Sequence, residues 1–158
     1  VLTSKENFGS RKHYLNQKHC MDVMLENNIL PIVNENDTVA VDEIKFGDND
    51  NLSSIVARLT GAKLLIILTD IDGYYDDDPR ENPDARLIHT LTEITDDMIN
   101  SAGGNGSSRG TGGMRTKLEA AKFAQEHNIE TIIMSGDNPK KIFDLFDGHN
   151  VGTHIKVK

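Results

Sequence analysis

The chain has 158 residues, 37% hydrophobic and 27% charged, with a formal net charge of −8, which is typical of one soluble globular domain with a sizeable core. The negative charge argues against binding to a nucleic-acid backbone, which requires a basic surface, but it is compatible with a local basic pocket for one nucleotide. No apolar run approaches the roughly 20 residues of a membrane span, and Cys20, the only cysteine, allows no internal disulfide, so we expect a cytoplasmic protein.

The N-terminal part of the chain predicts a strand, a helix and two further strands. Residues 1–3 read as the end of a strand without an initiator methionine, so we expect the protein to begin upstream. An apolar stripe predicts a helix over about 10–27, which places Cys20 near the core. The short apolar run at 29–33 predicts a buried strand, and the imperfect alternation at 39–46 predicts a hairpin or an edge strand.

The middle of the chain gives clearer signals. Residues 51–60 carry apolar side chains at helical spacing, and Gly61 is a natural helix stop. Residues 63–69 (KLLIILT) predict a strand that is apolar on both faces, as in a parallel sheet covered by helices. A loop rich in Asp, Gly and Pro follows over 70–83. Thr95 should cap a short helix that ends near residue 102.

Residues 103–113 (GGNGSSRGTGG) contain six glycines in eleven positions. A helix is predicted directly after them, over about 114–128, and then a strand over 130–135. Asn138-Pro139 should open a last helix, because proline favours the first helical position. Helices that alternate with strands predict a single α/β domain over 1–158, with a mainly parallel central sheet sandwiched by helices.

The glycine-rich segment is a candidate phosphate site. Glycines let the backbone approach a ligand closely, and the helix that follows offers unpaired N–H groups at its positive end. Lys117 lies in the first turn of that helix and adds a flexible cation. A solvated surface loop is the alternative, but the immediate helix and Lys117 favour polyphosphate binding. The pattern is not a P-loop, which needs GxxxxGK followed by Ser or Thr, and the third glycine of a dinucleotide fingerprint would fall on Arg115.

Three polar segments follow strands or precede helices. Residues 70–74 come after the strongest strand, where ligands of open α/β sheets bind, although they could equally form a plain turn. Residues 34–37 (NEND) and 47–51 (GDNDN) carry carboxylates and amides suited to an amine-bearing substrate; helix capping alone does not explain so many polar residues. The acidic run 76–78 is interpreted as a solvated turn, and the six histidines show no metal-ligand spacing, so no protein metal site is predicted.

Several motifs resemble those of the glutamate 5-kinases, a branch of the amino acid kinase family. The similar segments are 31–40, 46–53, 68–75, 78–80 and 110–114 with 116–121, and they occur in the family order over essentially the whole chain. Relative to that family, the chain lacks the N-terminal part with its second phosphate-site lysine. Near its end, His154 stands where the family tends to carry an aromatic residue after Gly-Thr.

The resemblance implies an amino acid kinase fold and transfer of the ATP γ-phosphoryl group, with Mg²⁺, to the side-chain carboxylate of L-glutamate. Catalytic roles are implied for Lys117, which offsets charge on the moving phosphoryl group, and for Asp50, which organises the site. The implied substrate-binding residues are Asn34, Asp37, Asp48 and Asn49. The implied ATP-binding residues are Thr69, Asp70, Thr111, Gly112, Gly113, Met114, Arg115, Thr116 and Lys117.

Two other functions are compatible with these motifs. A kinase of the same fold could act on another carboxylate, on carbamate or on UMP. The chain could also be a truncated, non-catalytic module that binds a nucleotide or an amino acid. The resemblance favours a homo-oligomer and allows for feedback inhibition by proline, but no motif in the sequence fixes either property.

Overall fold

The computed structural model describes residues 1–4, 6–36, 49–102 and 113–157. Its elements, in chain order, are β1 (Leu2–Thr3), α1 (Glu6–Gly9), α2 (Arg11–Glu26), β2 (Asn34–Glu35), α3 (Asn49–Thr60), β3 (Leu64–Thr69), β4 (Thr90–Leu91), α4 (Asp96–Ser101), α5 (Met114–Glu126), β5 (Glu130–Ser135), α6 (Lys141–Phe146) and β6 (Thr153–Ile155). The α/β class predicted from the sequence is confirmed.

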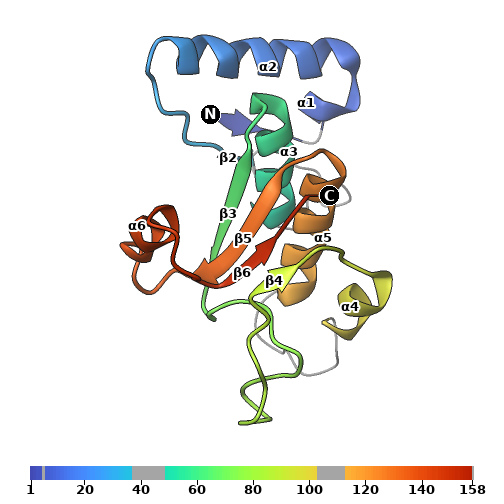
Figure 1. Cartoon of the computed structure of the whole chain (residues 1–158). Coiled ribbons are helices and arrows are strands. Elements are labelled where there is room, and N and C mark those ends of the chain that lie inside the picture. Colours follow the sequence, from blue (N-terminus) through green and yellow to red (C-terminus); the bar gives the residue numbers. More distant parts are fainter. Residues whose placement is uncertain (5, 37–48, 103–112, 158) are drawn as a thin grey trace.

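Two sheets organise these elements (Figure 1). The larger sheet has the strand order β3-β5-β6-β4, in which β3 pairs with β5 and β4 with β6 in parallel, while β5 and β6 are antiparallel. The smaller sheet consists of β1 and β2, which are parallel. The sheets are thus mainly parallel, as expected, with one antiparallel junction that sequence periodicity did not predict.

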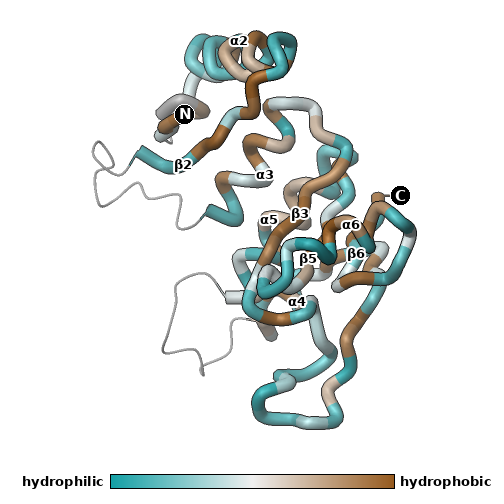
Figure 2. The backbone as a smooth tube through the Cα atoms, turned by 90° about the vertical axis from the view of Figure 1, so that its left-hand side faces the viewer, coloured by the Kyte–Doolittle hydropathy of each residue, from teal (hydrophilic) through white to brown (hydrophobic). Residues whose placement is uncertain are grey.

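The core lies between the larger sheet and the helices α3, α4 and α5. Leu65 and Ile67 of β3 and Ile133 of β5 meet Leu118 and the alanines of α5, and all these residues are buried. Alanine side chains let α5 lie close to the sheet, so the helix position is fixed by close packing. Figure 2 shows hydrophobic colour along β3 and also along the stretch that joins α2 to β2.

Helix ends follow the signals in the sequence. The Ser10 hydroxyl accepts a hydrogen bond from the His13 N–H at the start of α2, and Thr95 does the same for Met98 at the start of α4. Gly61 ends α3 with a φ of +66°, a conformation that favours glycine. The last helix begins further along the chain than predicted: α6 starts at Lys141 and not at Pro139.

Two predictions for the N-terminal part were wrong. The apolar run 29–33 is not a buried strand: Leu30 and Ile32 are 81% and 79% exposed, and the strand β2 begins only at Asn34. Cys20 is exposed rather than near the core, because the buried side chain of α2 is that of Met21. The predicted hairpin or edge strand at 39–46 lies outside the described residues.

Candidate active site

The chain topology brings the first turns of two helices to one edge of the larger sheet. Strand β3 follows α3 and strand β5 follows α5, and β3 and β5 run in parallel. Each helix therefore runs back along the sheet and begins near the carboxyl ends of these strands (Figure 1). Ligands of open α/β sheets bind at this edge.

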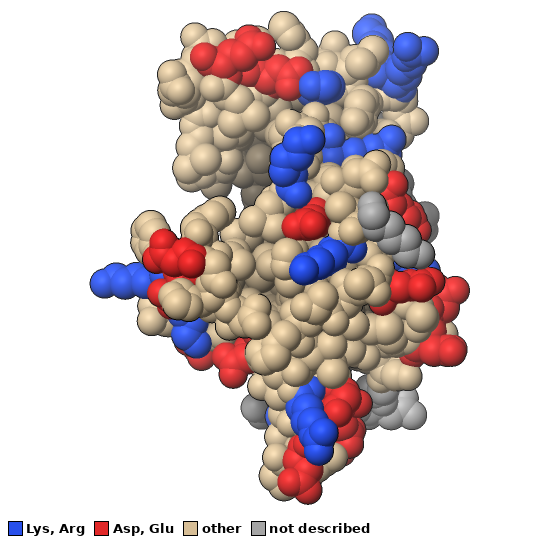
Figure 3. Space-filling view, viewed as in Figure 1, with Lys and Arg blue, Asp and Glu red and all other residues tan. Residues whose placement is uncertain are grey.

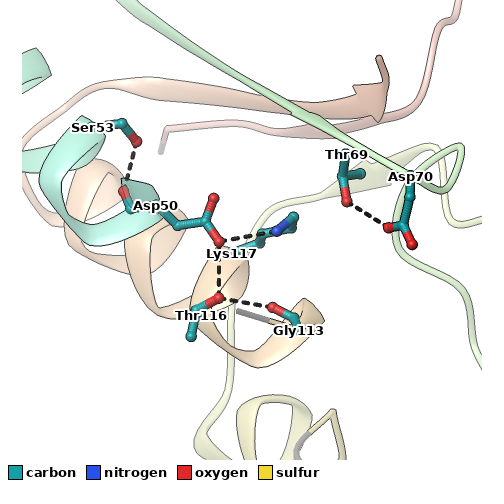
Figure 4. Close-up of polar contacts among 7 residues, drawn as sticks. All are labelled: Asp50, Ser53, Thr69, Asp70, Gly113, Thr116 and Lys117. Atoms are coloured by element: carbon teal, nitrogen blue, oxygen red, sulfur yellow. Dashed lines mark hydrogen bonds and ion pairs between the residues drawn. The ribbon is translucent and has the colours of Figure 1, made fainter. Parts of the chain in front are cut away.

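Asp50 joins the two helix starts. Its Oδ2 accepts a hydrogen bond from Lys117 Nζ at 3.0 Å and lies 2.8 Å from the Thr116 hydroxyl. The side chains of Asp50 and Lys117 are only 16% and 11% exposed, so the ion pair is largely shielded from water. Figure 4 shows this cluster between α3 and α5. Asp50 is thus in direct contact with Lys117, the other residue predicted to be catalytic, and with Thr116, which was predicted to bind ATP.

The carboxylate is itself held by α3. Asp50 lies in the first turn of this helix, where the macrodipole favours a negative charge. The Ser53 hydroxyl donates to the Asp50 backbone carbonyl at 2.6 Å, which adds a local bond to that turn. The backbone of Asp50 is fixed by these interactions, so its side chain can hold Lys117 in one place.

The first turn of α5 presents backbone donors beside Lys117. The N-cap residue is Gly113, which has no side chain to occupy the first N–H groups. Its carbonyl lies 2.8 Å from the Thr116 hydroxyl, which has one proton and donates either to this oxygen or to Asp50. A helix N-terminus next to an ammonium group is an arrangement that binds anionic phosphates.

The end of β3 carries a second group of polar residues. The Thr69 hydroxyl donates to Asp70 Oδ1 at 3.1 Å, and Arg80 bonds the other oxygen of Asp70 at 3.2 Å. The Gly136 N–H donates to the Thr69 carbonyl, which ties the turn after β5 to the end of β3. Sequence analysis identified the segment that contains Arg80 but did not predict its ion pair with Asp70.

Tyr74 is a partly buried titratable side chain in the loop after β3. Burial, followed by the negative charge of Asp76, raises the pKa of the Tyr74 phenol above its ordinary value of 10.0.

The predicted glutamate-binding residues are only partly described. Asn34 is exposed on β2, where its N–H donates to the Val1 carbonyl, and β2 contacts α3. Asn49 is exposed at the first position of α3, immediately before Asp50. The predicted residues Asp37, Asp48, Thr111 and Gly112 lie outside the described residues.

Two residues of the predicted ATP segment direct their side chains elsewhere. Met114 packs against the hydrophobic core. Arg115 forms an ion pair with Glu119 along the surface of α5, at 2.9 Å, and its side chain is 53% exposed. Such an exposed pair, four residues apart, contributes little to stability. Of these two residues, only the backbone N–H groups in the first turn of α5 remain as candidate contacts to phosphate.

The surface charge is mixed. On the face seen in Figure 3, basic side chains are interspersed with acidic ones. Within the described ranges, no group of three His, Cys, Asp or Glu side chains has the geometry of a metal site. None of the helices that the structure describes has the length and apolar character needed to cross a membrane.

Comparisons with known proteins give matches over most of the chain. A family model described as "Amino acid kinase family" matches residues 1–135. Glutamate 5-kinase of Geobacter metallireducens is 51% identical over 97% of this chain and 41% of that protein, and glutamate 5-kinase of Clostridium perfringens is 46% identical over 100% of this chain and 60% of that protein. This chain thus spans 41% and 60% of the length of these two relatives.

Solved structures at lower identity share the fold. Carbamate kinase from Giardia lamblia bound to AMP-PNP superposes with a TM-score of 0.64 at 22% identity, covering 90% of this chain and 45% of that chain. UMP kinase from Ureaplasma parvum superposes with a TM-score of 0.61 at 20% identity, covering 88% of this chain and 52% of that chain.

Proposed function

The chain belongs to the amino acid kinase family, and on this basis we propose that it forms part of a glutamate 5-kinase. The reaction is ATP-dependent phosphorylation of the side-chain carboxylate of L-glutamate, which gives γ-glutamyl phosphate for the first step of proline synthesis. The observation that carries the proposal is the contact of Asp50 with both Thr116 and Lys117. It places a shielded lysine beside the first turn of α5, where transferring phosphate can be bound.

The described residues divide the work of phosphoryl transfer. A carboxylate oxygen of glutamate attacks the γ-phosphorus, while the bond from that phosphorus to the β–γ bridging oxygen breaks and ADP leaves. Little covalent chemistry is required of the protein, so positioning and charge stabilisation supply the rate. Lys117 neutralises charge on the moving phosphoryl group, Asp50 orients Lys117, and the N–H groups at the start of α5 bind phosphate oxygens. Thr69 and Asp70 at the end of β3 contact the nucleotide.

ATP enters as its magnesium complex. Mg²⁺ in kinases is typically held by substrate phosphates, waters and one or two carboxylates rather than by a dedicated protein cage. Asp50 is the shielded carboxylate of the described site. In this role Mg²⁺ belongs to the nucleotide substrate.

Glutamate recognition is assigned to the residues before and at the start of α3. Asp37 pairs with the substrate ammonium group, and Asn49 bonds its α-carboxylate or ammonium, with Asn34 and Asp48 nearby. The contact between β2 and α3 supports this assignment, because it brings the elements of Asn34 and Asn49 together. Asn49 precedes Asp50, so bound glutamate would lie next to the phosphoryl-transfer cluster.

Sequence similarity favours glutamate over the substrates of other kinases of this fold. The relatives named glutamate 5-kinase are 46–51% identical to the chain, whereas the carbamate and UMP kinases are 20–22% identical. The single exposed thiol, Cys20, suits the reducing cytoplasm. Self-association and inhibition by proline are further expectations of this proposal.

The test measures ATP binding and turnover separately. MgATP should raise the melting temperature, and each tenfold excess over the dissociation constant adds about 1.4 kcal/mol of stability. Turnover is followed as ADP release with glutamate, and the acyl phosphate is trapped with hydroxylamine. Carbamate and UMP serve as control acceptors. A folded protein that ignores millimolar MgATP would overturn the proposal, and ATP use with carbamate or UMP but not glutamate would assign a different kinase.

A further inference from the structure

Thr153 at the start of β6 ties down the long loop that follows β3. Its side chain is fully buried. Its hydroxyl accepts a hydrogen bond from the Tyr74 N–H at 2.8 Å and donates one to the Ile88 carbonyl at 2.6 Å. Tyr74 and Ile88 also bond each other, since the Ile88 N–H donates to the Tyr74 carbonyl at 2.8 Å. One hydroxyl therefore fastens both ends of the loop 74–88 to the sheet.

The packing around this hydroxyl leaves little freedom. A Cβ added to Gly73 would lie 2.6 Å from Thr153 Oγ1, so the loop backbone touches β6 directly. On the other side, Gly152 has a φ of +71°, and a Cβ there would collide with the backbone of β5 at Ile133. The loop backbone at Gly73 is thus packed closely against Thr153, and the backbone at Gly152 against β5.

The loop 74–88 closely follows the residues assigned to the nucleotide, Thr69 and Asp70. Asp70 lies only four positions before Tyr74, and its partner Arg80 lies inside the loop 74–88. Movement of the loop base away from β6 would therefore shift both the Thr69–Asp70 segment and the arginine that bonds it. Asp70 and Arg80 are exposed, and their pair alone is too weak to fix the loop.

We propose that Thr153 is a positioning residue for ATP, which holds the nucleotide-facing loop after β3 in its binding conformation without touching the nucleotide. The inference rests on the proposed function. It requires a hydroxyl at this position, because valine has nearly the same shape but can neither accept the Tyr74 N–H nor donate to the Ile88 carbonyl. The apparent affinity for ATP then falls in proportion to the fraction of molecules that keep the loop in place.

The strand next to β6 offers a matched control. Thr131 of β5 is also fully buried, and within the described part of the chain its hydroxyl has no hydrogen-bond partner. Thr131→Val and Thr153→Val remove the same group from the same sheet, but only the second releases the loop. Thr153→Ser keeps the hydroxyl and should restore function. Gly73→Ala pushes the loop away from β6 while leaving Thr153 intact.

The experiment measures the dissociation constant of MgATP by calorimetry and the KM for glutamate in the same variants. We expect Thr153→Val and Gly73→Ala to weaken MgATP binding by roughly five- to thirtyfold, the range of a one- to two-kilocalorie effect, with the KM for glutamate nearly unchanged. Thr131→Val and Thr153→Ser should stay within about threefold of the wild type. In the wild type, the Tyr74 amide should exchange with deuterium as slowly as the amides of β5.

The outcomes separate this inference from the proposed function. If the wild-type protein does not bind MgATP, the proposed function is overturned. A wild type that binds, together with a Thr153→Val variant of equal affinity, would overturn only the role of Thr153. If Thr153→Val does not fold, three other results would each overturn the role of Thr153. They are an unchanged MgATP affinity in Gly73→Ala, weak MgATP binding by Thr153→Ser, and fast exchange of the Tyr74 amide in the wild type.

Discussion

The contact of Asp50 with Lys117 allows a double-mutant cycle with a defined expectation. Asp50→Asn removes the negative charge and keeps the shape of the side chain, and Lys117→Met removes the positive charge and keeps most of the length. If Asp50 acts in catalysis only by holding Lys117, then Asp50→Asn should lower kcat in the wild type and have no further effect in the Lys117→Met background.

The geometry sets the size of the stability effect. At 3.0 Å, two unit charges attract by about 5–6 kcal/mol at an effective dielectric constant of roughly 20. Desolvation offsets much of this, because both side chains are largely buried, and a hydrogen bond between charged groups retains about 1.5–3 kcal/mol net. Each single variant should therefore melt roughly 3–12 °C below the wild type, at about 2–4 °C per kcal/mol for a chain of this size.

Two measurements complete the cycle. Urea denaturation should give a coupling energy of about 1–3 kcal/mol between the two substitutions. In steady-state kinetics, Lys117→Met should lower kcat by on the order of a hundredfold, with a much smaller change in the KM for glutamate. Additive losses of stability would show that the two side chains are not energetically coupled, and an unchanged kcat in Lys117→Met would show that Lys117 takes no part in the reaction.

Three further predictions concern the substrate, the backbone and pH. Asn49→Ala should raise the KM for glutamate severalfold and leave that for ATP nearly unchanged; the opposite pattern in steady-state kinetics would assign Asn49 to the nucleotide. Gly152→Ala should lower the urea midpoint strongly, because φ is +71° and the new Cβ would collide with the backbone of β5, whereas Gly9→Ala meets no atom within 4 Å and serves as the neutral control. Hydrogen bonding and attraction from Lys122 lower the pKa of Asp96 below 3.8. The wild type should therefore be more stable than Asp96→Asn above that pH, and this difference in the free energy of unfolding should vanish as the pH falls through the lowered pKa. A difference that persists in acid would contradict this prediction.

Local patterns in the sequence determined most of the regular elements. The helices near 11–26, 49–60 and 114–126 and the strands 64–69 and 130–135 were predicted because each is long enough to repeat its apolar spacing. Thr95 and Gly61 marked helix ends because capping depends on the chemistry and φ of a single residue. The glycine-rich segment followed by Lys117 predicted a phosphate site for the same local reason, and this site stays a prediction.

Short strands and exposed apolar residues were decided by tertiary pairing. The strands β4 and β6 have two and three residues, too few to show a period, and exist because they pair with each other and with β5. The run 29–33 satisfied the local criteria for a buried strand, yet no described element covers Leu30 or Ile32. Burial depends on a partner surface, which a local pattern does not encode.

The site itself combines both kinds of information. The residue types of Asp50, Thr116 and Lys117 already suggested phosphate chemistry, and their family resemblance suggested their roles. Their contact joins positions 67 residues apart and exists because α3 and α5 pack together with their first turns at one edge of the sheet. The role proposed for Thr153 could likewise not be predicted from the sequence, because its hydroxyl meets the Tyr74 N–H only when the loop after β3 folds against β6.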